Sequence, residues 1–282
     1  LQDVAKLANV SRMTVSRALN HPDQVSQELR ELVDCAIKKL NYQPNVAAKA
    51  LAENRTRVVK FFNLEKDDTV EPYYAMLLNG IAQSLDDFQY ALQIVSPNSL
   101  NVGRCDGYIV TGLRREFYSW LDDLTHPVIL FGENHLGFDY VDTDNKQGTA
   151  EATNYAIAKN YQSIIFIGID LKEPFEISRE VGYSNTMRHY NKRARIICLP
   201  NHSHVSEHYL VEHWHEFSPN TCFICASDRL ALGIERGLQR CGARIPLDFG
   251  IIGFDGVFLD QIASPKLTTV KQHVTLMGRE CG

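Results

Sequence analysis

Residues 3–20, DVAKLANVSRMTVSRALN, decide how the chain is organised. They predict two short helices joined by a tight turn at Asn9–Ser11, where the apolar pattern is interrupted. Ser11 can cap the second helix by accepting a hydrogen bond from a free N–H of its first turn. On both sides of the turn, apolar residues recur at spacings of three and four and define one inner face: Val4, Leu7 and Ala8, then Val15, Ala18 and Leu19.

The outer face of the second predicted helix is polar and basic. It carries Arg12, Met13, Ser16 and Arg17. Guanidinium groups suit guanine edges and phosphates, so we interpret the pair of helices as a DNA-binding helix-turn-helix. The alternative, for an isolated segment, is an ordinary helical hairpin with a solvated basic face.

Length and composition indicate an ordinary globular protein with two or three domains. Of the 282 residues, 44% are apolar and 22% are charged. No apolar run approaches the roughly 20 residues that cross a membrane, and no signal peptide opens the chain. The seven cysteines are scattered through mostly apolar segments, which favours reduced thiols in a cytoplasmic protein over a disulfide framework.

The formal net charge of −5 is unevenly distributed. Residues 1–60 contain 10 Lys and Arg and 6 Asp and Glu, a net charge of +4. The remainder contains 19 basic and 28 acidic residues, a net charge of −9. A basic head on an acidic body predicts a polyanionic partner for the head alone.

A third helix is predicted after the loop at His21–Asp23. Ser26 can cap its start, and acidic residues near that end and lysines near the other complement the helix dipole. Its predicted buried stripe consists of Leu29, Leu32, Val33, Ala36, Ile37 and Leu40. Three helices with so little apolar material form a small domain, residues 1–43, that is marginally stable alone.

Residues 44–57 are predicted to connect this head to the body. The segment Asn45–Asn54 is rich in alanine and contains one leucine, Leu51, with no apolar stripe around it. A helix of this length is marginal in water by itself. Two interpretations stay open: a plain linker, or a hinge helix that forms only against another surface.

From Val58 the sequence alternates between short apolar strands and amphipathic helices. Such strands predict parallel sheets with helices on both faces. Eight units exceed one sheet, so we predict an α/β body, residues 58–282, of two doubly wound lobes. The first is residues 58–142 plus a crossover after 270, and the second is residues 143–270. Sites in such sheets lie at the carboxyl ends of strands, here between the lobes. The predicted strands are VVKFFNL, YALQIV, GYIVTG, PVILFG, SIIFIGI, RIICLP, TCFICA and FGIIGF.

Motifs in a fixed order over essentially the whole chain produce a family resemblance. They are DVAKLANVSxxTVSRALN, VSQELRELV and LNYQPNVAAKAL, then CDGYIV, ASDRLALG, GIIGFDG and SPKLTTVKQ. The chain resembles bacterial transcription regulators of the LacI/GalR family. That resemblance implies a three-helix helix-turn-helix head, a hinge helix, and a two-lobed body like that of periplasmic sugar-binding proteins.

The resemblance also implies roles for residues of the head and hinge. Arg12, Met13 and Arg17 would face base edges in the major groove, where a bidentate arginine–guanine pair is worth about 1–3 kcal/mol. Leu51 would wedge into a minor-groove step at the centre of the operator. The other polar residues would position the head on phosphates or close the turn. The complete predicted DNA-binding set is Ser11, Arg12, Met13, Thr14, Ser16, Arg17, Asn20, Asn45, Ala48 and Leu51.

For the body, the resemblance implies an effector cleft. Arg179 would form forked hydrogen bonds to ligand hydroxyls or carboxylates, and Asp228 and Asp255 would accept hydrogen bonds from sugar hydroxyls. Tyr73 and Tyr74 would stack on the ligand, a sugar or sugar phosphate. Structural alternatives stay open, because Asp228 can cap the helix that begins there and Tyr74 can belong to the core.

The sequence departs from the family pattern in three places. It begins inside the first motif, and it ends at Gly282, before the helix and strand that usually complete the lobes. The segment between Val95 and Asp106 is shorter than the helix that the family usually has there. Two interpretations stay open: real deletions, which would put the integrity of the first lobe in doubt, or disordered residues of the protein that the sequence does not include.

Catalytic and metal-binding alternatives find little support. Cys222 and Cys225 lie in one apolar strand, where a spacing of three does not put both thiols on one side. His204 and His208 have a helical spacing that can hold zinc, but the acidic residues nearby complete no known signature, and a solvated helix face is favoured. No nucleophile elbow, P-loop or dinucleotide-binding glycine motif occurs. We predict that the chain is not an enzyme and needs neither cofactor nor metal.

The predicted mechanism couples two sites. A homodimer would hold two heads on a pseudo-palindromic operator, and the hinge helices would fold as they dock. A sugar that closes the cleft would relieve repression. Corepression by a purine, a nucleoside or a protein is the alternative, because the residues do not fix the sign of the coupling. A transport-type sugar-binding protein would fit the body, but the basic head argues against it.

Overall fold

The computed structural model describes residues 1–42, 50, 54–65, 72–96 and 103–282. The chain forms two compact units, residues 1–57 and 58–282. Most of the predicted hinge lies outside the described residues, including Asn45, Ala48 and Leu51. None of the helices in the described part of the chain is both long and apolar enough to span a bilayer.

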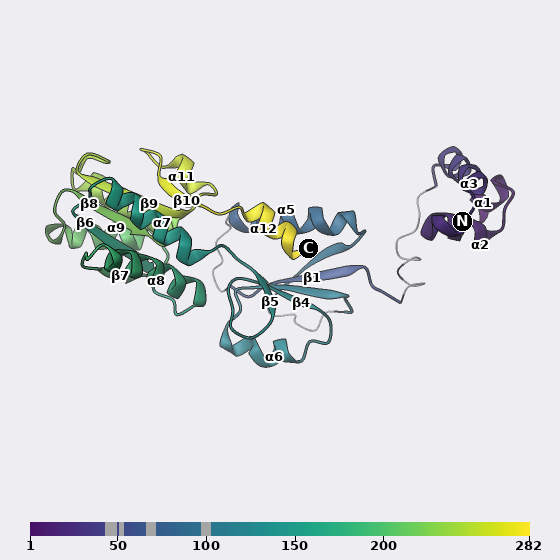
Figure 1. Ribbon diagram of the computed structural model, residues 1–282, viewed down its shortest axis with the longest axis horizontal. Coiled ribbons are helices and arrows are strands. Elements are labelled where there is room, and N and C mark those ends of the chain that lie inside the picture. Colours follow the sequence, from purple (N-terminus) through teal and green to yellow (C-terminus); the bar gives the residue numbers. More distant parts are fainter. Residues whose placement is uncertain (43–49, 51–53, 66–71, 97–102) are drawn as a thin grey trace. The chain divides into compact units, whose positions relative to one another are not determined.

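Residues 1–42 of the first unit form a bundle of three helices: α1 (Gln2–Leu7), α2 (Arg12–Asn20) and α3 (Gln27–Leu40), with a 3-10 turn at Pro22–Gln24 (Figure 1). The two predicted helix caps are confirmed. Ser11 accepts a hydrogen bond from the Thr14 backbone N–H at 3.0 Å, and Ser26 accepts one from the Leu29 N–H at 3.5 Å. The core is built from small side chains: Val4, Ala5, Ala8, Val15, Val33 and Ala36.

The predicted buried stripe of α3 is too wide. Val33 and Ala36 are buried, but Leu32 is 52% exposed and Leu40 is 43% exposed. Leu32 lies about 100° around the helix from Val33, outside the narrow face that α1 and α2 cover. Leu40 is the last residue of the helix. Small core residues bring three short helices together along a single line of contact, which leaves the flanking leucines in solvent.

The first lobe of the second unit contains a five-stranded parallel sheet. The strand order is β2-β1-β3-β4-β5. The bounds are β1 Val58–Asn63, β2 Ala91–Val95, β3 Gly107–Thr111, β4 Val128–Phe131 and β5 Asp139–Val141. Since β1 pairs with β2 on one side and β3 on the other, the order of strands reverses there, and a site is expected at the carboxyl end of this junction.

Helices cover both faces of this sheet (Figure 1). On one face, α5 (Pro72–Asp87) packs beside α12 (Val274–Cys281), so the C-terminal helix returns to the first lobe. Gly80 makes this close approach possible, because a Cβ there would lie 2.1 Å from the Thr275 carbonyl oxygen. The other face carries a 3-10 turn (Arg115–Phe117) and α6 (Tyr118–Asp122).

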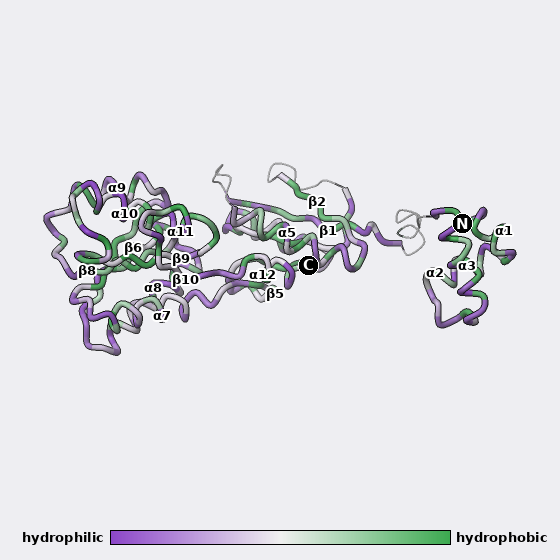
Figure 2. The backbone as a smooth tube through the Cα atoms, turned by 90° about the horizontal axis from the view of Figure 1, so that it is seen from above, coloured by the Kyte–Doolittle hydropathy of each residue, from purple (hydrophilic) through white to green (hydrophobic). Residues whose placement is uncertain are grey.

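The second lobe repeats the architecture with strand order β10-β9-β8-β6-β7. Its strands are β6 Ser163–Ile169, β7 Ile196–Leu199, β8 Thr221–Cys225, β9 Phe249–Asp255 and β10 Thr268–Lys271. Its helices are α7 Asn145–Ala158, α8 Pro174–His189, α9 Ser203–Glu212, α10 Asp228–Arg240 and α11 Leu259–Ile262, with a 3-10 turn at Trp214–Glu216. The central strands are strongly hydrophobic along their length (Figure 2), as expected for strands covered on both faces.

All eight predicted strands are confirmed, as is the doubly wound α/β class. Two further strands, β5 and β10, occur where the sequence predicts only crossovers between lobes. They have three and four residues, lie at sheet edges and contain the polar residues Asp139, Thr268 and Thr269, so they lack a continuous apolar run. Each strand leads directly into a crossover and therefore belongs to the lobe that the chain is leaving.

Candidate functional site

The predicted DNA-binding face of α2 is on the surface. Arg12, Met13 and Arg17 are exposed, Met13 with 62% of its surface accessible. Ser11 and Thr14 are joined by a hydrogen bond of 2.9 Å between their hydroxyls, which fixes the start of the helix. Ser16 is half-buried on the same helix. Asn20 ends α2, and Val15 anchors the helix to the core from the opposite face.

A second candidate site is a cavity of about 280 Å³ within the body. It lies at the carboxyl ends of the strands, where both sheets have their reversal of strand order. Thr111 at the end of β3 lines it from the first lobe, and Ile169 at the end of β6 and Ser227 after β8 line it from the second. This is where open α/β sheets bind ligands. Four predicted effector residues line the cavity: Tyr73, Tyr74, Arg179 and Asp255.

Arg179 is the buried cation of the cavity, with 6% of its surface exposed. It projects from α8, and its Nε donates to Asn145 Oδ1 at 2.9 Å while Nη1 donates to the Ala226 carbonyl oxygen. Its guanidinium carbon lies 3.8 Å from the ring centroid of Phe254 and 5.1 Å from that of Phe175. These contacts hold the guanidinium in one orientation, and its Nη2 makes no hydrogen bond to any described residue.

Asp255 is the acidic partner on the second lobe, at the end of β9. Its φ of 131° is a backbone conformation that side chains other than glycine rarely adopt, and such strain often marks ligand sites. Its Oδ1 accepts a hydrogen bond from Gln272 Nε2 at 2.9 Å. Burial raises the pKa of Asp255 to about 6, although Arg179 and the bond from Gln272 oppose that rise.

Gln272 is a buried hub that was not predicted. It follows β10, and its Oε1 accepts hydrogen bonds from Tyr73 of the first lobe at 3.2 Å and from Thr143 in the crossover at 2.8 Å. Because its amide also donates to Asp255, it links both lobes to a crossover segment. Tyr73 is thereby fixed by its hydroxyl, and burial raises its pKa well above the ordinary value.

The aromatic residues of the first lobe pack edge to face. The ring centroid of Tyr73 lies 5.8 Å from that of Tyr74 and 6.1 Å from that of Phe131, with interplanar angles of 78° and 62°. Both tyrosines are half-buried and pack against the core cluster of the first lobe. They therefore belong both to the core and to the wall of the cavity.

Asp142 and Glu133 were not predicted, yet both line the cavity. Asp142 follows β5 and accepts hydrogen bonds from the backbone N–H groups of Glu133 and Thr143 at 2.8 and 2.7 Å, and from Asn145 at 3.0 Å. Burial raises the pKa of Asp142 in spite of these bonds. Glu133 accepts a hydrogen bond of 2.8 Å from the hydroxyl of Ser178 on α8, which joins the two lobes across the cavity.

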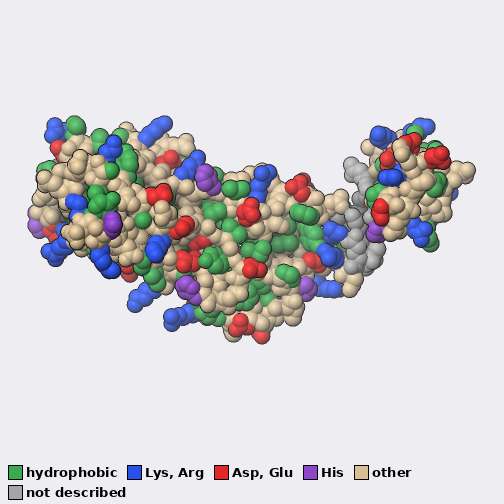
Figure 3. Space-filling model, in the orientation of Figure 1, with side chains coloured by type: hydrophobic (Ala, Val, Ile, Leu, Met, Phe, Trp, Pro, Cys, Tyr) green, Lys and Arg blue, Asp and Glu red, His purple; other side chains and the backbone are tan. Residues whose placement is uncertain are grey.

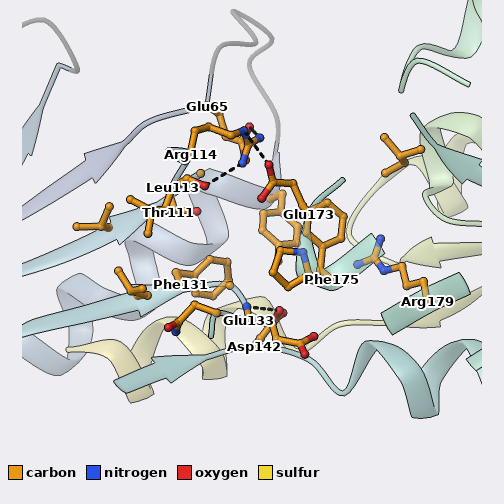
Figure 4. A pocket seen from close by; sticks show the side chains of 18 of the residues that line it. Glu65, Thr111, Leu113, Arg114, Phe131, Glu133, Asp142, Glu173, Phe175 and Arg179 are labelled. Atoms are coloured by element: carbon orange, nitrogen blue, oxygen red, sulfur yellow. Dashed lines mark hydrogen bonds and ion pairs between the residues drawn. The ribbon is translucent and has the colours of Figure 1, made fainter. Parts of the chain in front are cut away.

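A second connection between the lobes is an ion pair at one end of the cavity (Figure 4). Arg114, in the loop after β3, donates to Glu65 of its own lobe at 2.8 Å. Its Nε also lies 3.4 Å from Glu173 Oε1, at the start of α8 in the other lobe. Figure 4 shows this cluster and Glu133, Asp142 and Arg179 as separate parts of one lining.

Asp228 differs from the prediction, because it does not line the cavity. It is 1% exposed, and its Oδ2 accepts from the Gly256 N–H at 2.8 Å while its Oδ1 accepts from the Thr269 hydroxyl at 2.6 Å. These bonds tie α10 to β9 and β10. The helix cap is the preceding residue, Ser227, which accepts from the Leu230 N–H. Burial, with Asp255 nearby, raises the pKa of Asp228 to about 7.

The lining residues that the sequence did not predict share one position in the fold. Glu65, Arg114, Glu133 and Asp142 all follow closely on strands of the first sheet, at their carboxyl ends. The positions after each predicted strand are therefore a usable list of candidates. These four residues lie in loops outside the family motifs, so the resemblance did not predict them.

The cysteine and histidine segments are apart from both candidate sites. Cys222 and Cys225 are buried in β8, and burial raises the pKa of both thiols. On α9, His208 is exposed, and its Nε2 lies 3.1 Å from Glu212 Oε1. Within residues 1–42, 50, 54–65, 72–96 and 103–282, no three His, Cys, Asp or Glu side chains gather in a way that could hold a metal ion.

Two protein families match two separate parts of the chain, and each part contains residues of one candidate site. Residues 1–45 match the family described as bacterial regulatory proteins, lacI family. Residues 153–282 match the periplasmic binding protein-like domain. The first match covers the exposed face of α2, and the second covers the lobe that supplies Arg179 and Asp255.

Relatives match over nearly the whole chain. An uncharacterised HTH-type transcriptional regulator of Bacillus subtilis, YvdE, is 49% identical over all of this chain and 89% of its own length. The HTH-type transcriptional regulator CelR of Thermobifida fusca is 30% identical over 99% of this chain and 88% of its own length.

Solved structures show the same fold. A complex of CelR with cellobiose matches with a TM-score of 0.70 and 27% identity, over 99% of this chain and 90% of the other. The lac repressor dimer bound to operator and an anti-inducer matches with a TM-score of 0.75 and 21% identity, over 99% and 88% of the two chains.

Proposed function

This chain belongs to the LacI family of bacterial transcriptional regulators, and from that premise we propose that it represses carbohydrate-utilisation genes and leaves its operator when a sugar binds. As a family member it is a DNA-binding regulator. The single observation that carries the further proposal is the lining of the cavity, in which Arg179, Asp255 and aromatic rings converge between two lobes. Hydrogen-bonding groups of both polarities beside ring faces suit a polyol.

The head is proposed to bind the operator. Arg12, Met13 and Arg17 would meet base edges, while Ser11, Thr14, Ser16 and Asn20 would contact phosphates or support the turn. In this proposal residues 1–43 form the head and residues 44–57 form a hinge. There Asn45, Ala48 and Leu51 would contact DNA, with Leu51 entering the minor groove. The exposed arginines of α2 support the part that concerns the major groove.

The body, residues 58–282, is proposed to dimerise and to bind the effector. Two copies would present two heads to a pseudo-palindrome. The similar solved structure of a transcriptional regulator CelR in complex with cellobiose supports a sugar as the ligand. The polar links between lobes, Glu133 with Ser178 and Arg114 with Glu173, would respond to closure around it. We propose no enzymatic activity for the chain and a place in the cytoplasm beside its DNA.

The test begins with the DNA, because the operator is unknown. Purified protein selects duplexes from a pool of random sequences at low salt, and the bound fraction is sequenced. We expect a pseudo-palindrome, and no selection by an Arg12→Ala, Arg17→Ala double variant. Mono-, di- and trisaccharides are then added to the complex. Release by one of them supports the proposal, tighter binding identifies a corepressor instead, and failure to select any sequence contradicts operator binding.

A further inference from the structure

We infer that the cavity is selective for an uncharged sugar and rejects the corresponding sugar phosphate. This inference rests on the proposed function and narrows it, since the sequence leaves both classes of ligand open. It depends on three features of the lining: the balance of charges, the occupied state of both arginines, and the residues at the helix ends that face the cavity.

Carboxylates outnumber guanidinium groups in the lining. Among the described residues that line the cavity, two arginines, Arg114 and Arg179, are matched against five acidic residues: Glu65, Glu133, Asp142, Glu173 and Asp255. On the face of the body drawn in Figure 3, several acidic side chains lie over the region where the lobes meet. An excess of negative charge in a partly buried space disfavours a phosphate monoester, which carries between one and two negative charges at neutral pH.

Both arginines already make contacts that a phosphate would have to share or displace. Arg114 is held between Glu65 and Glu173, so binding a phosphate would require it to break an ion pair. Arg179 has Nε and Nη1 committed to Asn145 and Ala226. Bidentate recognition of phosphate needs two parallel N–H groups of one guanidinium, whereas a single sugar hydroxyl needs only one.

The helix ends at the cavity are also unsuited to an anion. A helix N-terminus ordinarily attracts phosphate through its free N–H groups and its dipole. At α8, that end carries the carboxylate of Glu173 and begins with Pro174, which has no N–H. At α10, Ser227 occupies the Leu230 N–H, and the buried carboxyl group of Asp228 follows it. The first residue of α5 is again a proline, Pro72.

The same groups fit hydroxyls well. A hydroxyl donates to a carboxylate and accepts from a guanidinium, so a polyol can satisfy both signs without adding charge. Asp255 has one oxygen bound by Gln272, and Glu133 has one bound by Ser178. The Asp255 carboxylate is also stabilised by a hydrogen bond from the backbone of Asp228. Glu133 Oε1 accepts no hydrogen bond from the described residues, which leaves an acceptor for a ligand hydroxyl.

The test compares each neutral sugar with its own phosphate ester by thermal shift and calorimetry. The pairs are glucose and glucose 6-phosphate, maltose and maltose 6′-phosphate, cellobiose and cellobiose 6′-phosphate, and sucrose and sucrose 6-phosphate. We expect a neutral member to bind and its ester to bind at least about 30-fold more weakly. Raising the ionic strength from 0.05 to 0.5 M should narrow this ratio, because salt screens repulsion.

Two variants test the cause of the selectivity. Glu133→Gln and Glu173→Gln should each reduce the ratio of neutral to phosphorylated affinity several-fold, and Glu212→Gln, an exposed side chain at the end of α9, should not. Because each ratio is measured within one variant, a general loss of affinity cancels. An ester that binds as tightly as its sugar and releases DNA overturns this inference while the proposed function stands. Binding of neither member of any pair overturns both.

Discussion

The outer face of α2 and the lining of the cavity both present arginines, and they hold them in opposite ways. Arg12 and Arg17 are exposed and come from a single helix of nine residues. Arg179 is almost completely buried between two phenylalanine rings, and Arg114 is held by carboxylates from both lobes. The α2 surface is held in place by Val15, which is buried on the opposite face of the helix. In the cavity, the side chains that form the lining hold one another in position.

This difference determines how separable function is from stability. A side chain on α2 can be removed without disturbing the packing beneath it, so its loss should appear only in DNA binding. A side chain of the cavity is also part of the structure that positions its neighbours, so its loss should affect ligand binding and folding together. The following predictions test that contrast.

The largest effect is expected from Arg179→Ala. It removes the cation that faces the ligand, the positive charge that stabilises the Asp255 carboxylate and the donor to Asn145, so sugar affinity should fall by about 100-fold or more. Calorimetry with the sugar found by screening measures this loss. The melting temperature of the body should also fall, whereas Arg240→Ala, an exposed arginine on α10, should change neither quantity. Unchanged sugar affinity would contradict the assignment of the cavity.

Replacing one arginine of α2 should have the next largest effect. Arg12→Ala or Arg17→Ala removes a base-edge contact worth about 1–3 kcal/mol, which weakens specific operator binding by roughly 5- to 150-fold. Gel-shift titration measures this, with Lys39→Ala on α3 as the matched control. The melting temperature and sugar affinity should stay unchanged. A destabilised head would show that the surface of α2 also supports its fold, and the contrast would disappear.

Asp228 is expected to make the stability of the body depend on pH. Its pKa is about 7 in the folded protein and 3.8 ordinarily, so the folded state binds a proton more tightly than the unfolded state. The resulting stabilisation is complete below pH 4 and is lost as the pH rises through about 7.

Asp228→Asn keeps a group that can bond Gly256 and Thr269 but does not titrate. Between pH 5 and pH 8 the wild-type body should lose about 2–3 kcal/mol more stability than this variant, which lowers its melting temperature by several degrees. Thermal melts at both pH values measure the difference. Asp122→Asn, on exposed α6, serves as the control and should behave as wild type. Equal losses in wild type and Asp228→Asn would show that Asp228 does not titrate in this range.

The smallest effect is expected from Arg114→Ala. Its ion pairs with Glu65 and Glu173 are partly exposed, and such pairs contribute about 0.2–1 kcal/mol. Sugar affinity should change only about two- to five-fold, and high salt should abolish the difference between variant and wild type. Calorimetry at two salt concentrations tests this. A loss as large as that of Arg179→Ala would place Arg114 among the direct ligand contacts.

Sequence predicted the two regions unequally, for a physical reason. The face of α2 depends on helical periodicity and on one cap at Ser11, both of which are local. Periodicity failed where packing is limited, at Leu7, Leu32 and Leu40, which were predicted to be buried and are 48%, 52% and 43% exposed. The eight apolar strands were predictable because burial on both faces leaves a continuous apolar run, and β5 was not because it has three residues.

The cavity depends on contacts between residues far apart in the chain. Arg179, Asp255, Tyr73 and Tyr74 were assigned by resemblance, and all four line the cavity. Asp228 was assigned in the same way but is turned toward Gly256, and no periodicity reveals which way a carboxylate at a strand end points. The link from Glu133 to Ser178 joins residues 45 positions apart, so it exists only after both lobes have folded.

Gln272 lies where a rotation of one lobe relative to the other would be centred. Its hydrogen bonds with Tyr73, Thr143 and Asp255 place a pivot at the ends of the strands nearest the cavity. Strand β1 begins at Val58, and five residue steps of about 3.3 Å put that residue about 17 Å from the cavity end of the strand. A rotation of about 10° at the pivot would displace Val58 by about 3 Å. The displacement is therefore largest where the chain enters the body from the head.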